Sequence, residues 1–200
     1  MNAQGPAPPP DLSRRRLPLQ TLSPDTPLWR VHDDRRDPIW FGPATGSAPY
    51  GRFDPAAGEF RVCYVGLSPA AAFAETFLRN PGQRMLDRTL LGSRALTTLR
   101  SRRPLSLVRL SGLARAGATA EVTHGRAYEL ARAWSVALWS HPARPDGILY
   151  TSRHDNGELC AALFDRASDA VGHDRSERVL SIPVLRGLLS RYALRFDPRG

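Results

Sequence analysis

The chain has 200 residues, a formal net charge of +9 and 42% hydrophobic residues, which fits one globular domain with a core of its own. It contains no run of about 20 apolar residues and no apolar signal-peptide segment, which argues against a membrane span and a secretory signal. We therefore expect a cytoplasmic protein.

The charge of the chain predicts an anionic partner. All 28 basic residues are arginine, and a guanidinium can hold a phosphate or a carboxylate with two parallel hydrogen bonds. The partner can be a nucleic acid, a phosphorylated small molecule or an acidic protein. Cys63 and Cys160 form no CxxC pair and the five histidines show no ligand spacing, so we expect no metal site and no disulfide framework.

Residues 1–27 differ in composition from the rest of the chain. They contain seven of the prolines, at positions 6, 8, 9, 10, 18, 24 and 27, and the triplet RRR at 14–16. Proline lacks a backbone N–H and cannot sit inside a helix or a central strand. We predict an extended or disordered tail over 1–27 and a domain over 28–200.

The first elements of the domain are two predicted strands separated by a long loop. LWRVH at 28–32 and RVCYVGL at 61–67 are rich in valine and aromatic residues, which suit strands. The segment 40–58 is rich in Gly, Pro, Ser and Ala and is expected to be a loop that closes in a turn.

A helix is predicted over 69–79. Ser68 suits the N-cap, Pro69 suits the first helical position, and NPG at 80–82 is a stop signal. The apolar residues of this segment share one face, and Glu75 falls at the border of that face. A carboxylate at such a border either reaches water or faces a cleft.

The later elements are mixed in type. We predict strands at 104–110, 146–152, 178–184 and 193–196 and helices over 125–140 and 185–192, while 81–103 stays unassigned and 157–164 is ambiguous. Helices and strands that do not alternate strictly predict a single domain of the α+β class.

Familiar site motifs are absent: the sequence contains no P-loop, no GxGxxG after a strand, no HExxH and no GxSxG. What remains are polar residues in or beside predicted strands and helices. They are Arg30, Arg52, Tyr64, Glu75 and Ser152. Taken singly, each has an ordinary structural interpretation, such as a salt bridge, a core tyrosine or a cap.

Together and in this order, these residues resemble the RES domain family, named for an arginine, a glutamate and a serine. The arginine matches Arg30 in LWRVH, the glutamate matches Glu75 in AAAFAET after YVGLSP, and the serine matches Ser152 in DGILYTSRHDN. GRFD with Arg52, and Tyr64 in CYVGL, also match. The resemblance runs from about residue 28 to about 196.

The resemblance implies an ADP-ribosyltransferase-like α+β fold, with mixed sheets and flanking helices. It implies a toxin of a bacterial toxin–antitoxin pair that consumes NAD+ as its substrate, by hydrolysis or phosphorolysis, without a metal. Arg30, Glu75 and Ser152 would be catalytic, and Arg30, Arg52, Tyr64 and Ser152 would bind NAD+. The implied partners are a helix-turn-helix (Xre-like) antitoxin and, as an acceptor, inorganic phosphate. A homodimer is compatible with it, whereas membrane or direct nucleic-acid binding is not expected.

These residue types suit the chemistry that the resemblance implies. Cleavage of the nicotinamide–ribose bond develops positive charge on the ribose, and a carboxylate such as Glu75 stabilises that charge. Arg30 and Arg52 would hold the pyrophosphate, Tyr64 would stack on nicotinamide, and Ser152 would hydrogen-bond the ribose or the carboxamide.

Two other functions compete with NAD+ cleavage. One is a protein mono-ADP-ribosyltransferase that uses the same pocket. The other is a basic nucleic-acid-binding module, which RRR at 14–16 and RSRR at 100–103 favour, although no helix-turn-helix is evident. The sequence leaves open the acceptor, the oligomeric state, the antitoxin's identity, and the roles of 1–27 and 81–103.

Overall fold

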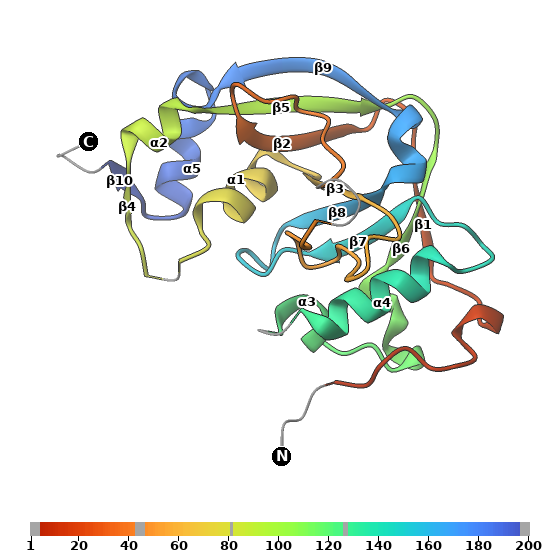
Figure 1. Ribbon diagram of the computed structural model, residues 1–200. Coiled ribbons are helices and arrows are strands. Elements are labelled where there is room, and N and C mark those ends of the chain that lie inside the picture. Colours follow the sequence, from red (N-terminus) through yellow and green to blue (C-terminus); the bar gives the residue numbers. More distant parts are fainter. Residues whose placement is uncertain (1–4, 43–46, 81, 126–127, 197–200) are drawn as a thin grey trace.

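The computed structural model describes residues 5–42, 47–80, 82–125 and 128–196 (Figure 1). The strands are β1 (Leu19–Leu22), β2 (Pro27–Asp33), β3 (Val62–Gly66), β4 (Met85–Leu86), β5 (Arg94–Ser101), β6 (Leu105–Arg109), β7 (Gly147–Thr151), β8 (Leu159–Phe164), β9 (Val171–Arg178) and β10 (Arg195–Phe196). The α-helices are α1 (Pro69–Phe77), α2 (Arg88–Gly92), α3 (Glu121–His124), α4 (Glu129–Trp139) and α5 (Leu185–Arg191). The 3₁₀ helices are η1 (Leu12–Arg14), η2 (Leu110–Ala116), η3 (Asp165–Ala170) and η4 (Val179–Ser181).

The main sheet is mixed and folds over on itself. Its strand order is β1-β6-β7-β8-β3-β2-β5-β9, with β6 and β7 parallel and the other pairs antiparallel. Strands β2 and β3 share a single residue pair, Trp29 with Gly66. The part made of β2, β5 and β9 therefore lies over the part that contains β3, β8 and β7 (Figure 1). Such weak pairing lets the sheet bend at this point.

Three apolar clusters hold the layers together. The first lies between α4 and β3, β7 and β8, and it contains the fully buried Trp134 and Phe53. The second takes residues from both parts of the folded sheet, among them Leu28 and Leu163. The third packs α1 and α5 against β2 and β5 through residues such as Phe73. The α+β class that the mixed elements predict agrees with this arrangement.

The amino-terminal segment differs from the predicted separate tail. In the described part of it, β1 pairs with β6 at the edge of the sheet, and Leu12 and Leu17 are buried in the first cluster. The indole N–H of Trp134 donates to the carbonyl of Pro6 at 3.1 Å. Proline is compatible with an edge strand and with extended backbone, and the leucines between the prolines supply apolar surface to bury. Residues 1–4 lie outside the described residues.

The predicted helix at 69–79 is confirmed as α1. The Ser68 hydroxyl accepts the backbone N–H of Ala71 at 2.9 Å, and Pro69 opens the helix, as the sequence predicts. The strand predictions at 28–32, 61–67, 104–110 and 146–152 correspond to β2, β3, β6 and β7. The ambiguous segment 157–164 contains strand β8, and 81–103 contains β4, α2 and β5.

The predicted strand at 178–184 is wrong. Residues Val179–Ser181 form the 3₁₀ helix η4, and α5 begins at Leu185 after three intervening residues. Val179, Ile182 and Leu185 are all buried, and their spacing of three residues suits a helical turn rather than a strand. Pro183 also lacks the N–H that a ladder would need.

Within the described residues, no helix combines the length and the apolar character that a membrane crossing requires.

Candidate active site

Glu75 and Ser152, which lie 77 residues apart in the chain, meet at the end of β7. The Ser152 hydroxyl donates to Glu75 Oε1 at 2.6 Å and accepts the backbone N–H groups of His154 at 3.1 Å and Asp155 at 3.3 Å. Ser152 is fully buried, and Glu75 is half-buried at the border of the apolar face of α1, where the sequence places it. The serine therefore holds the carboxylate in one orientation.

The loop that follows Ser152 is itself anchored by two adjacent residues at the end of α5. Asp155 accepts hydrogen bonds from Arg191 at 2.7 Å and from the Tyr192 hydroxyl at 2.8 Å. Burial works to raise the pKa of Asp155, but hydrogen bonds from Tyr192 and Gly157 and the charge of Arg191 lower it overall.

Glu158 joins this loop to helix α1. Its carboxylate accepts the hydroxyl of Ser68, the N-cap of α1, and pairs with Arg191 at 2.8 Å. The backbone N–H of Ser152 also donates to the Glu158 carbonyl at 2.9 Å. The elements that carry Glu75 and Ser152 are therefore connected to each other beyond the direct hydrogen bond between them.

Arg52 is the most unusual charge near this pair. It is 8% exposed, and its Nη1 and Nη2 atoms are buried without a hydrogen-bond partner among the described residues. Its guanidinium carbon lies 4.4 Å from the ring centre of Tyr128. Burial lowers the pKa of Arg52, while the nearby Tyr128 and Glu75 oppose that shift. Buried charges are costly unless they are paired, so this guanidinium is suited to receive an anion.

A network of hydrogen bonds fixes the loop that carries Arg52. Asp54 Oδ2 accepts the backbone N–H groups of Tyr50 at 2.9 Å and Gly51 at 2.6 Å, and Asp54 Oδ1 accepts the Tyr64 hydroxyl at 2.8 Å. That hydroxyl in turn accepts the backbone N–H of Phe53 at 2.8 Å. A Cβ at Gly51 would collide with the Tyr64 ring, so glycine is needed at this close approach.

This network gives a stability prediction. We expect Asp54→Ala to lower the free energy of unfolding by about 2–4 kcal/mol, because three partly buried donors lose their acceptor. Urea unfolding followed by circular dichroism measures the change. Glu59→Ala is the matched control, since Glu59 is exposed on the same connection. A loss no larger than that of the control would contradict a structural role for Asp54.

Tyr64 lies in β3 with its hydroxyl engaged by the Arg52 loop. The residue is half-buried against the first cluster, and burial, with the nearby charge of Asp54, raises the pKa of its hydroxyl. The structure therefore connects Tyr64 to Arg52 through Asp54. Its predicted stacking on nicotinamide stays a prediction.

Arg30 contacts neither Glu75 nor Ser152. Its Nη1 atom donates to the Cys63 sulfur at 2.9 Å and to the Trp40 carbonyl at 3.0 Å. Trp29 and Val31 on either side of it pack toward the cluster of α1, and alternation along the strand turns Arg30 the other way. The charge of Glu75 instead acts on Arg52, where it opposes the lowering of the pKa by burial.

Sequence reasoning missed several neighbours of Glu75. His154 is half-buried, and burial lowers its pKa while the charge of Glu75 opposes that effect. Burial raises the pKa of Tyr150, which also lies near Glu75 and Arg52. His154 follows Ser152 closely in the chain, which is a usable signal. The sequence contains no comparable signal for Tyr128 and Tyr150. Tyr128 was predicted to be a core residue of a helix, and Tyr150 was predicted to lie in a strand.

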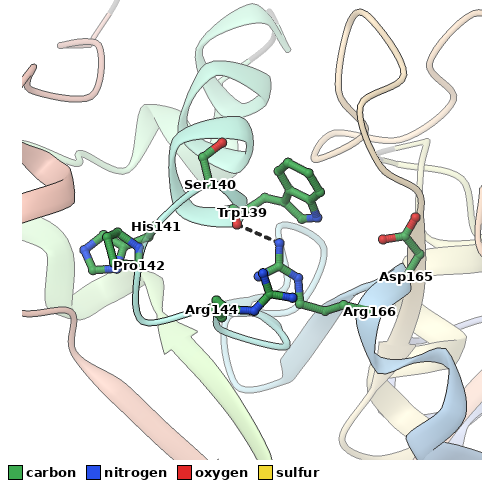
Figure 2. Close-up of a pocket in the computed structure, with 7 residues that line it drawn as sticks. All are labelled: Trp139, Ser140, His141, Pro142, Arg144, Asp165 and Arg166. Atoms are coloured by element: carbon green, nitrogen blue, oxygen red, sulfur yellow. Dashed lines mark hydrogen bonds between the residues drawn. The ribbon is translucent and has the colours of Figure 1, made fainter.

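Two further features bear on where ligands bind. A pocket of about 420 Å³ is lined by residues at the end of α4 and the start of η3, and none of the predicted site residues lines it (Figure 2). Among the described residues, no group of three His, Cys, Asp or Glu side chains is arranged to hold a metal ion.

The fold and the site together define a class. The chain is an α+β domain with a folded mixed sheet, which contains an oriented carboxylate and a buried guanidinium that is suited to an anion and feels the charge of that carboxylate.

Comparison with known proteins identifies the family. A family model described as "RES domain" matches residues 27–184, and the chain belongs to the RES domain family. The chain is 45% identical over 63 residues to "Probable toxin y4kH" of Sinorhizobium fredii, a match that covers 32% of this chain and about half (49%) of that relative.

A solved structure shares the fold. The chain is similar to a chain in the crystal structure of the M. tuberculosis MbcT–MbcA toxin–antitoxin complex, with a TM-score of 0.61 and 16% identity. The likeness covers 86% of this chain and 91% of that chain. The chain therefore shares its fold with that chain, and the predicted α+β class is confirmed.

Proposed function

We propose that this protein is the toxin of a toxin–antitoxin pair and that it cleaves the nicotinamide–ribose bond of NAD+. The observation that carries the proposal is the buried Arg52 guanidinium, with two unpartnered nitrogens among the described residues, within electrostatic range of the Glu75 carboxylate that Ser152 orients. The names of the similar proteins support the toxin role. The antitoxin would be a helix-turn-helix protein, as the family resemblance implies.

The proposed reaction needs little proton transfer from the enzyme. The bond between ribose C1′ and the nicotinamide nitrogen breaks with its electron pair on nitrogen, so nicotinamide leaves neutral and needs no general acid. Positive charge grows on the ribose, and the Glu75 carboxylate stabilises it. An acceptor oxygen then bonds to C1′ and releases its proton to solvent.

Arg52 and Ser152 have distinct roles in this proposal. The free Nη1 and Nη2 atoms of Arg52 would donate to the pyrophosphate, each charge-assisted hydrogen bond being worth about 1.5–3 kcal/mol. The Ser152 proton already points to Glu75, so Ser152 acts first by orienting the carboxylate. Tyr64 would stabilise the Arg52 loop and offer its ring to nicotinamide.

The test is incubation of the purified protein with NAD+, with and without inorganic phosphate. Free ADP-ribose identifies water as the acceptor, and ADP-ribose 1-phosphate identifies phosphate. With NAD+ labelled in the adenylate part, label retained on protein would instead favour a protein mono-ADP-ribosyltransferase. Absence of nicotinamide release under all conditions would reject the proposal.

Arg30 has a testable role of its own. We expect Arg30→Ala to raise KM and lower kcat, because the loss of its hydrogen bonds to Cys63 and Trp40 loosens the place where the sheet folds over. Nicotinamide release measures both constants, and a melting curve reports the loosening. Arg30→Lys is the control for charge alone. An unchanged kcat/KM in Arg30→Ala would rule out a role in binding or catalysis.

A further inference from the structure

The pocket of about 420 Å³ lies where the end of α4 meets the start of η3 (Figure 2). Its wall is formed by the turn at 140–144 on one side and by Asp165 and Arg166 on the other, with Trp139 between them. None of the residues proposed for NAD+ cleavage lines it.

Arg166 brings unsatisfied donors to this pocket. Its Nη2 atom donates to the Trp139 carbonyl at 2.7 Å, while Nε and Nη1 are buried without a partner among the described residues. The indole Nε1 of Trp139 is a third buried donor without a partner among those residues. Burial and then the charge of Arg144 lower the pKa of Arg166. Arg144 lines the same pocket, so two guanidinium groups share its wall.

The turn holds Arg144 in a strained conformation at the pocket. Arg144 has a φ of 45°, in the left-handed region that residues other than glycine rarely adopt. His141 fixes the turn, because its Nδ1 accepts the backbone N–H of Ala143 at 3.0 Å and its carbonyl accepts that of Arg144 at 2.9 Å. Its Nε2 lies 3.1 Å from the Arg15 carbonyl. Strain that the surrounding structure maintains is typical of ligand sites.

The nearby carboxylates are engaged elsewhere. Asp165 lines the pocket, but its Oδ2 atom accepts the backbone N–H of Arg61 at 3.1 Å and lies 3.9 Å from the Arg61 Nε atom. Asp146 pairs with Arg103 at 2.8 Å. Neither carboxylate is within salt-bridge distance of Arg144 or Arg166 among the described contacts. Asp165 and Asp146 thus act on Arg166 only from beyond ion-pair distance, where their charges partly oppose the lowering of its pKa.

We propose that this pocket binds a phosphate group. Its donors come from α4, the turn and η3, so they approach from different directions, which suits a tetrahedral oxyanion better than a planar carboxylate. A dianionic phosphate also neutralises both guanidinium groups. The phosphate is either inorganic phosphate or the terminal group of a phosphorylated small molecule. This site is separate from the one proposed for NAD+.

The Trp139 indole N–H reports directly on binding. In ¹H–¹⁵N spectra the signal is assigned by its absence in Trp139→Phe. Titration with inorganic phosphate or with adenosine monophosphate is expected to shift it saturably, whereas chloride at equal ionic strength is not. A nucleotide that binds at least about tenfold more tightly identifies a phosphorylated small molecule as the ligand, and equal affinities identify the phosphate group itself.

Matched variants separate this site from the other. Arg144→Gln is expected to weaken phosphate binding by about tenfold or more, because a charge-assisted contact is lost. The exposed Arg186→Gln is the control for net charge. Arg52→Gln should leave the Trp139 titration unchanged, so the result does not depend on NAD+ cleavage. No shift with phosphate, an equal shift with chloride, or undiminished binding in Arg144→Gln would overturn the proposal.

Discussion

Glu75→Gln is expected to abolish NAD+ cleavage while leaving the fold intact. The amide oxygen of glutamine can still accept the Ser152 hydroxyl, so the local structure should persist. The negative charge that would stabilise the positive ribose is lost, and a loss of one such electrostatic group costs about 10²–10³ in kcat. Nicotinamide release under saturating NAD+ measures the effect, and a melting curve checks the fold.

The control for this variant is Glu59→Gln, which removes one carboxylate charge at an exposed position. It should retain full activity. If Glu75→Gln keeps a kcat within about threefold of the unchanged protein, Glu75 does not supply the proposed charge stabilisation.

The second large effect concerns Arg52, for which activity and stability should change in opposite directions. Arg52→Met is expected to lower kcat/KM by about 10²–10⁴, because two charge-assisted contacts to the substrate are lost. The same change removes a buried charge that lacks a partner among the described residues, so we expect the free energy of unfolding without NAD+ to stay constant or to rise.

Arg115→Met is the matched control, because Arg115 is exposed and remote from the predicted site residues in sequence. It should alter neither kinetics nor stability. A strong loss of stability in Arg52→Met would show that the guanidinium is a structural group and would contradict its assignment to substrate binding.

Local signals in the sequence predicted much of the secondary structure. Ser68 and Pro69 predict the start of α1 because capping depends only on neighbouring residues. The strand prediction at 178–184 was wrong because this segment has too few apolar residues to distinguish a strand from a helical turn. The prediction of a separate tail over 1–27 differs from the structure because proline content reports on backbone freedom. It does not report how much apolar surface the leucines of this segment bury.

The sequence predicted the candidate site only in part. Arg30, Arg52, Tyr64, Glu75 and Ser152 were selected together by resemblance to a family, and the residues alone had ordinary explanations. The pairing of Glu75 with Ser152 joins α1 to the end of β7, and no local pattern encodes a contact over 77 residues. The side of β2 on which Arg30 lies depends on which neighbours the strand acquires.

The order of residues along this chain by itself determined where α1 and the strands β2, β3, β6 and β7 lie, the α+β class and which polar residues to consider. Those features arise from caps, alternation and backbone restrictions among close neighbours. Only the tertiary structure decided that the sheet folds over at Trp29 and Gly66, that Arg52 is buried, and that Arg30 donates to Cys63. These depend on packing between distant segments, whose free energy is shared by the whole core.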